Sequence, residues 1–173
     1  AIPFFILAGN LMEVGGISNR LVNFAKSIVG GLQGGLGMTC VMTCMIFAAV
    51  SGSSVATTFA IGAILIPALI KHGYPTNFAA ALQATSAELG VIIPPSIPMI
   101  LFGVAAEVSI GELFIAGVGP GLLIGGMRML FVHLYCRWRG WGLNDGDGRR
   151  KPLRAGLEAG WALLMPVIIL GGI

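Results

Sequence analysis

The chain has 173 residues, of which 56% are hydrophobic and 10% are charged, with a formal net charge of +3 and a mean hydropathy of +0.92. A soluble domain carries roughly a quarter charged residues, so this composition excludes a water-solvated globule and predicts an integral membrane protein. The apolar runs do not alternate with polar residues, and the 27 glycines show no triplet period. These patterns exclude an outer-membrane barrel and collagen and leave an all-α helical bundle.

The first two segments are predicted to be a helix end and an interfacial helix. Residues 1–14 are apolar apart from Asn10 and Glu13, whose side chains suit interfacial or interhelical hydrogen bonds. Because this stretch is too short to span a bilayer and has no start methionine, we expect the chain to be an internal fragment of a longer membrane protein. Residues 15–26 combine basic and apolar side chains, which indicates a helix lying at the membrane surface.

Residues 27–70 hold no charged side chain and are long enough for two crossings of roughly 20 residues with a turn between them. The turn is predicted where hydroxyls and a glycine interrupt the apolar run, at Ser51, Gly52, Ser53, Ser54 and Thr57. If two half-length helices meet there in a re-entrant hairpin, free N–H groups could face an anion, and carbonyl and hydroxyl oxygens could face a cation. An ordinary turn between two full spans fits the hydropathy equally well.

A second interruption falls within residues 77–106, which are otherwise long and apolar enough to cross the membrane. Closely spaced prolines remove amide donors there, so carbonyls one turn earlier lose their helical partners. The residues concerned are Gly90, Val91, Pro94, Pro95 and Ser96. Unpaired carbonyls are costly in hydrocarbon, so we expect an ion or substrate site at this break, with a mechanical kink as the alternative.

Glu88 is the one acidic residue that lies deep inside an apolar run, two turns before the break. A carboxylate at that depth is expensive and indicates a functional role by default, here as the partner of a proton or a cation. The alternative is a structural role, in which Glu88 caps a broken helix segment or bonds to a hydroxyl of the hairpin.

The remaining segments are predicted to be a span, a loop and the start of another span. Residues 113–136 form an apolar run in which three glycines lie four residues apart and so allow close helix packing. Residues 137–154 form a hydrophilic basic loop, and residues 157–173 begin a further apolar segment.

When the membrane crossings are counted from these predictions, the acidic and the basic connecting segments fall on opposite sides of the membrane. Glu107 and Glu112 fall on one side, and the basic residues of the other connections fall on the opposite side. The positive-inside rule then places the basic loops in the cytoplasm.

Two other functions remain open from the residues alone. An intramembrane serine hydrolase would use Ser53 as nucleophile and His72 or His133 as base, but both histidines are expected at the basic boundary and no oxyanion pattern accompanies the serine. A structural membrane anchor would leave both polar interruptions without a role. Cys40 and Cys44 share a helix face without a nearby histidine or carboxylate in sequence, which favours buried small side chains over metal ligands.

Six stretches of the chain resemble the large membrane subunit of tripartite ATP-independent periplasmic (TRAP) transporters, the DctM-like permease family. They are AIPFFILAGNLMEVGGIS (1–18), FAAVSGSSVAT (47–57), KHGYP (71–75), AELGVIIPPSIPMILFG (87–103), SIGELFIAGVGPG (109–121) and WALLMPVIILGGI (161–173). They follow the family's order and spacing across almost the whole chain. The resemblance implies a transporter subunit, not an enzyme, and an N-terminal-half fragment of the permease.

For the fold, the resemblance implies half of an inverted-repeat elevator transporter, with the second repeat beginning just past Gly171 and Gly172. In that family a re-entrant hairpin and a broken helix of the first repeat form half of the clamshell that holds substrate and sodium. Carried onto this sequence, the hairpin tip is Ser51, Gly52, Ser53 and Ser54, and the broken helix is Gly90 through Ser96. Glu88, Asn10 and Thr57 are further candidates on the strength of their polar side chains alone.

For the activity, the resemblance implies sodium-coupled secondary import of a small organic anion, such as a C4-dicarboxylate or a related carboxylate. The implied partners are a small DctQ-like membrane subunit and a periplasmic binding protein that delivers the substrate. No cofactor is expected beyond Na⁺ as the coupling ion, and no nucleic acid. The implied location is the bacterial inner membrane.

Overall fold

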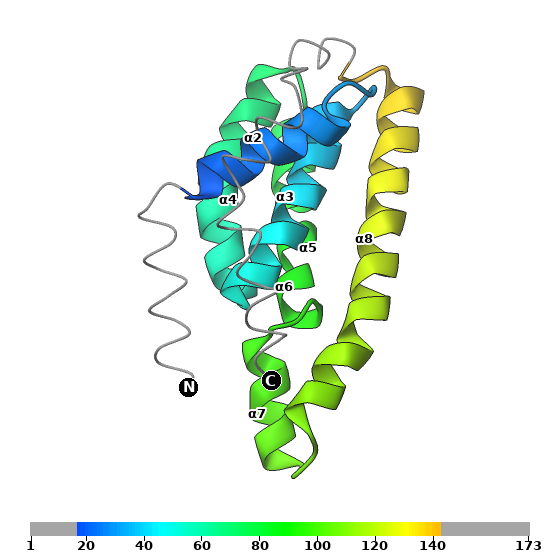
Figure 1. Cartoon of the computed structure of the whole chain (residues 1–173). Helices are drawn as coiled ribbons and strands as arrows, with labels where there is room; N and C mark the ends of the chain where they lie inside the picture. Colours follow the sequence, from blue (N-terminus) through cyan, green and yellow to red (C-terminus); the bar gives the residue numbers. More distant parts are fainter. Residues whose placement is uncertain (1–16, 143–173) are drawn as a thin grey trace.

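The computed structural model describes residues 17–142, and this part of the chain is all helical (Figure 1). Its elements are α2 (Ile17–Val29), α3 (Gly35–Ser51), α4 (Ser54–Lys71), α5 (Thr76–Ala87), α6 (Leu89–Ile92), α7 (Ile97–Ala105) and α8 (Ile110–Arg139). The predictions for residues 1–14 and 157–173, Asn10 included, and for most of the loop at 137–154 lie outside the described residues.

Three helical stretches are long and apolar enough to cross a membrane, namely Ser54–Lys71, Thr76–Ala105 and Ile110–Arg139. α3 is also apolar but shorter, and α2 lies across α3 and α4 near one end of the bundle (Figure 1). The described part therefore has the all-helical, multi-span architecture that the composition predicts.

α8 extends beyond the predicted span at 113–136 because charged residues belong to its first and last turns. Ser109 caps its N-terminus, where the Glu112 N–H donates to the serine hydroxyl over 3.4 Å, and Gly140 ends the helix with φ 70°. An acidic first turn and a basic last turn complement the helix dipole, so the charges used to bound the span lie inside the helix.

α3 and α4 form a tight helical hairpin around Gly52 and Ser53. α3 ends on Gly52, which has φ 60°, a left-handed conformation that glycine adopts at little cost. Ser53 then caps α4, because its hydroxyl accepts a hydrogen bond from the Ala56 N–H over 3.3 Å. The predicted turn thus ends one helix and starts the next within two residues.

The proline break separates α6 from α7. Residues Ile93 to Pro95 leave the helix, with the Pro94–Pro95 peptide bond cis, and Ser96 is the extended N-cap of α7. Pro98 lies in the first turn of α7, where the missing N–H costs no helical hydrogen bond. The prolines therefore end one helix and begin another, and the alternative of a kink in a single helix is not what the structure shows.

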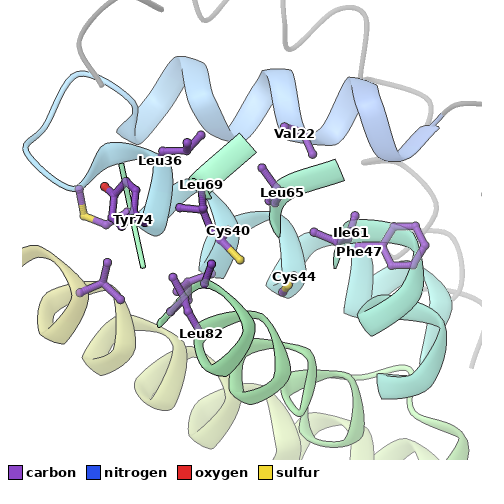
Figure 2. Close-up of a cluster of buried hydrophobic side chains, with 14 of the residues drawn as sticks. Val22, Leu36, Cys40, Cys44, Phe47, Ile61, Leu65, Leu69, Tyr74 and Leu82 are labelled. Carbon is purple, nitrogen blue, oxygen red and sulfur yellow. The ribbon is translucent and has the colours of Figure 1, made fainter. Parts of the chain in front are cut away.

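α3 is the centre of the packed core. It contacts α2, α4, α5, α6 and α8, and most of its side chains are buried, as expected for a helix without a polar face. Figure 2 shows the core side chains around it, which include Val22 of α2, Cys40, Cys44 and Phe47 of α3, Ile61, Leu65 and Leu69 of α4, and Leu82 of α5. The core therefore fixes the hairpin against the helices that flank it.

α8 packs against the rest of the bundle through the predicted glycines. A Cβ atom at Gly117 would lie 2.8 Å from the Ile92 carbonyl oxygen. A Cβ atom at Gly121 would lie 2.8 Å from Ile93 Cγ1. The opposite face of α8 exposes large apolar side chains, among them Ile115, Leu122, Leu123, Met127 and Leu134. Such a face suits lipid or another membrane segment.

Aromatic and basic side chains gather at one end of the bundle. Phe78 stacks on Tyr135 with ring centroids 5.5 Å apart, and Trp141 packs edge-on against Tyr135 at 5.6 Å. The Arg139 guanidinium lies 5.7 Å from the Tyr135 ring centre. Lys71 ends α4 at this same end, whereas the acidic α7–α8 connection lies at the other (Figure 1). Aromatic rings and cations together are typical of a membrane interface.

Candidate functional site

The hairpin tip and the proline break lie against each other. The Ile97 N–H, the first of α7, donates to the Gly52 carbonyl at the hairpin tip over 3.1 Å. A Cβ atom at Gly90, before the break, would lie 2.9 Å from the Ser54 nitrogen and 3.0 Å from the Ser53 carbonyl carbon. The two predicted interruptions therefore lie in direct contact, and the close approach of their backbones requires glycine at position 90.

A hydroxyl cluster closes the hairpin tip. Ser51 and Thr57 are both buried, and their side-chain oxygens lie 3.3 Å apart. The Thr57 hydroxyl donates to the Ser53 carbonyl over 2.7 Å, and the Thr58 hydroxyl donates to the Ser54 carbonyl over 2.8 Å. Hydroxyl and carbonyl oxygens are thus concentrated within one turn, and such oxygens are the ligands that hard cations prefer.

A serine replaces one helical hydrogen bond that the prolines remove. Pro95 supplies no donor for the Val91 carbonyl, and the Ser96 hydroxyl donates to that carbonyl over 2.7 Å. Pro94, Pro95 and Ser96 are all buried. Ser96 is therefore held at the junction, where it occupies the N-cap position of α7 without a side-chain capping bond.

Two helices begin at this junction and two end there. α4 begins at Ser54 and α7 at Ile97, while α3 ends beside Gly52 and α6 ends before Ile93. Helix N-termini carry partial positive charge and free N–H groups, which suit an anion, whereas C-terminal carbonyls suit a cation. The junction therefore brings two helix N-termini and two helix C-termini together.

Gln83 of α5 bonds to both arms of the hairpin, a role that the sequence analysis misses. Its side-chain oxygen accepts a hydrogen bond from the Cys40 thiol at 3.1 Å, and its amide nitrogen donates to the Thr57 carbonyl over 3.2 Å. The side chain is 1% exposed. Gly62 of α4 leaves room for its stem, since a Cβ atom there would lie 3.3 Å from Gln83 Cγ. An amide that directly follows the apolar run from Phe78 to Leu82 was the available signal.

Ser86 is a second polar residue that the sequence analysis misses. It lies one helical turn before Gly90, is completely buried, and its hydroxyl has no hydrogen-bond partner within residues 17–142. A buried hydroxyl without a partner is costly, so Ser86 joins the candidate ligands of the site. Its i to i+4 spacing from Gly90 could have indicated a position on the same face of the helix.

Glu88 does not join the hydroxyl cluster. It forms the turn between α5 and α6, and its side chain is exposed and makes no helix-capping hydrogen bond. The two structural roles expected for it, a helix cap and a bond to a hairpin hydroxyl, are both absent from the part of the chain that the structure describes. The carboxylate therefore calls for a different explanation.

The histidines lie away from the hairpin tip. His72 Nδ1 is 2.8 Å from the Ala68 carbonyl at the end of α4, and His133 Nδ1 is 3.0 Å from the Gln33 carbonyl before α3. Neither can serve as a base for Ser53, which caps the opposite end of α4. Within the described ranges, no three His, Cys, Asp or Glu side chains are placed to hold a metal ion.

The whole chain is similar to known membrane transport proteins. The family model described as "Tripartite ATP-independent periplasmic transporter, DctM component" matches residues 1–173. The isethionate TRAP transporter permease protein DctMQ of Oleidesulfovibrio alaskensis is 48% identical over 177 residues, which cover 100% of this chain and 27% of the relative. The C4-dicarboxylate TRAP transporter large permease proteins DctM of Vibrio cholerae and Pseudomonas aeruginosa are 46% and 45% identical over 173 residues, which cover 100% of this chain and 38% and 40% of the relatives. The chain therefore spans 27–40% of the length of these relatives.

Proposed function

Because the chain belongs to the DctM-component family of tripartite ATP-independent periplasmic (TRAP) transporters, we propose that its complete permease imports small organic anions by sodium-coupled secondary transport. Membership makes the chain a multi-pass transporter component and not an enzyme. The observation that carries the proposal is the contact between hairpin tip and proline break, where the Ile97 N–H bonds to the Gly52 carbonyl.

The proposed site divides its two ligands by charge. Sodium binds the oxygens of the tip and the break, and the substrate carboxylate lies at the N-termini of α4 and α7. The residues of the site are Ser51, Gly52, Ser53, Ser54, Gly90, Val91, Pro94, Pro95 and Ser96, with Thr57 and Ser86 as further candidates. The relatives' names specify isethionate and C4-dicarboxylates, all organic anions, which supports an anionic substrate of this kind.

The proposed coupling needs no covalent step. In the proposed mechanism, α3 and α4 form a re-entrant hairpin. The remainder of the permease supplies an inverted second repeat, which completes an elevator-type mobile domain. Sodium that bridges oxygens of the tip and the break stabilises their closed contact, and that contact sets the helix N-termini that hold the carboxylate. Import follows if the mobile domain changes position only when it is empty or when sodium and substrate are both bound, because the sodium gradient then drives the substrate inward.

The proposed partners are a small DctQ-like membrane subunit and a periplasmic binding protein that delivers the substrate. The name DctMQ of one relative, and its greater length for the same matched segment, support a subunit of the DctQ type. The exposed apolar face of α8 offers surface suited to a membrane partner or to lipid.

Replacing Ser53 or Ser96 with alanine in the complete permease is expected to raise the sodium concentration for half-maximal uptake by about threefold or more. Each change removes a hydroxyl that shapes the site, either the cap of α4 or the bond to the Val91 carbonyl. The measurement is sodium-dependent uptake of radiolabelled C4-dicarboxylate in proteoliposomes, together with the amount of inserted protein.

Matched controls exist for both serines. Ser109→Ala removes an equivalent N-cap at α8, and Ser27→Ala removes a hydroxyl that donates to the Phe24 carbonyl over 2.6 Å in α2. Both controls should keep the native sodium titration. An unchanged titration in Ser53→Ala and Ser96→Ala would remove these residues from the proposed sodium site.

The proposed orientation places the basic end of the bundle in the cytoplasm of the bacterial inner membrane. Asn77→Cys, on the exposed start of α5 near Lys71, should react with an impermeant maleimide only from the cytoplasmic side. Val108→Cys, 45% exposed in the acidic α7–α8 connection, should react only from the periplasmic side. Both variants are made in a cysteine-free permease, and the reverse pattern would overturn the orientation.

A further inference from the structure

Arg128 places a permanent positive charge in the middle of a membrane-spanning helix. By helix rise, it lies about 16 Å from the Arg139 end of α8 and about 27 Å from the Ile110 end. The hydrocarbon core of a bilayer is about 30 Å thick, so with Arg139 at the interface Arg128 lies near mid-depth. That distance is too great for the guanidinium to reach the headgroups by snorkelling.

Arg128 lies on the inward side of α8. It follows Gly125, where an added Cβ atom would overlap Met45 of α3, and precedes Val132, which is completely buried. The three- and four-residue spacings put these positions on one face of the helix. Arg128 is half-buried, and its Nη1 atom is buried without a hydrogen-bond partner among residues 17–142. A guanidinium remains protonated, so it needs an anionic partner at this depth.

Glu88 is the matching unpaired charge. Its carboxylate is exposed on the junction of α5 and α6, within the stretch Thr76–Ala105 that is long enough to span the membrane. Neither Glu88 nor Arg128 makes an ion pair within the described chain. Two opposite charges without partners thus lie on two neighbouring membrane segments, and each is expensive when left alone.

The aromatic contact between α5 and α8 gives the relative depth of these charges. Phe78 of α5 and Tyr135 of α8 stack at 5.5 Å and therefore lie at one level. α5 runs away from this end of the bundle, whereas α8 runs toward it (Figure 1). Residues after Phe78 in α5 and residues before Tyr135 in α8 therefore lie on the same side of the stacked rings. Glu88 lies about 15 Å and Arg128 about 10 Å from the level of these rings. Helical side chains lean toward the N-terminus of their own helix. The Glu88 side chain therefore leans toward the level of Arg128, and the Arg128 side chain leans toward the level of Glu88.

We propose that Arg128 and Glu88 form an ion pair at mid-depth that joins α8 to the start of the proline break. The pair requires rotation of the two long side chains toward each other, and it neutralises both charges in a low-dielectric surrounding. Glu88 lies two residues before Gly90, which contacts the hairpin tip. Arg128 is therefore a positioning residue for that contact, acting through Glu88.

The test is a double-mutant cycle in the complete permease with Glu88→Gln, Arg128→Gln, the double neutral variant and the swap Glu88→Arg/Arg128→Glu. Each single change leaves one charge alone at mid-depth and should lower sodium-driven uptake at least about tenfold, with a lower thermal unfolding midpoint. The double neutral and swap variants should recover most of the unfolding midpoint, because neither leaves an unmatched charge. The unfolding measurement does not depend on transport, so it tests the pair even if the proposed sodium coupling fails.

The sodium concentration for half-maximal uptake is a second readout. It distinguishes a role of the ion pair in positioning the proline break from a role in stability alone. The double neutral variant, folded but without the pair, should need about threefold more sodium for half-maximal uptake than the native protein. Glu107→Gln/Arg139→Gln, at opposite ends of the bundle, is the matched control and should show purely additive effects. The pair is refuted if the double neutral variant is as unstable as the two single changes combined, or if Arg128→Gln alone is silent.

Discussion

Adding one methyl group at Gly90 is expected to reduce sodium-driven uptake at least about tenfold, and Gly90→Val should abolish it. The new Cβ atom would lie 2.9 Å from the Ser54 nitrogen and 3.0 Å from the Ser53 carbonyl carbon, which are backbone atoms and cannot rotate away. The hairpin tip must then move off the break, and the hydrogen bond from Ile97 to Gly52 lengthens or is lost. Uptake in proteoliposomes, with the amount of inserted permease as reference, measures the effect.

Glycines of α8 provide the control for this prediction. An added Cβ atom at Gly119 or Gly126 would meet no atom within 4 Å in the described chain. Gly119→Ala and Gly126→Ala should therefore keep native uptake, since alanine also favours a helix more than glycine does. Native uptake in Gly90→Ala would mean that the tip and the break separate without cost, and the proposed site would lose its main support.

Gln83→Glu is expected to destabilise the hairpin by at least about 2 kcal/mol. The amide nitrogen that donates to the Thr57 carbonyl over 3.2 Å becomes a second carboxylate oxygen, so two acceptors face each other in a side chain that is 1% exposed. Gln83→Met keeps the volume, adds no charge and should cost about 1 kcal/mol. Thermal unfolding of the purified permease gives the order of stability, with native first, methionine second and glutamate last.

Gln33→Glu is the matched control, because Gln33 is only half-buried in the connection between α2 and α3. It should unfold close to the native temperature. A Gln83→Glu permease as stable as the native protein would show that the bonds from α5 to the two hairpin arms do not hold the arms in place.

The two interruptions of the apolar pattern could be found from sequence because their causes are local. Gly52 ends α3 through its own positive φ, and Ser53 caps α4 through a hydrogen bond from Ala56, three residues away. Pro94 and Pro95 end α6 because they lack amide hydrogens. Each effect depends on a few neighbouring residues, so the residue types and their order were enough to predict where helices stop.

Residues whose partners lie far along the chain could not be assigned in this way. Gln83 bonds to Cys40 and Thr57 on two other helices, and nothing adjacent to it in sequence indicates either partner. The importance of Arg128 is difficult to see in the sequence for a different reason. A single charge among many apolar residues leaves the mean hydropathy of the span high. The cost of burying Glu88 follows from its place in an apolar run, but its exposed position outside the hydroxyl cluster depends on how α5 turns into α6.

The sequence by itself determined that lipid is the solvent of this protein, where helices end and begin at the two polar interruptions within residues 17–142, and which connections are basic or acidic. Composition and short-range backbone effects suffice for those properties. Only the tertiary structure decided that Gly52 and Ile97 meet, that Gly90 lies against Ser54, and that Arg128 faces inward. Those outcomes depend on how the helices pack around α3, and packing is set by the combined shapes of side chains from several helices, which no single segment of the sequence contains.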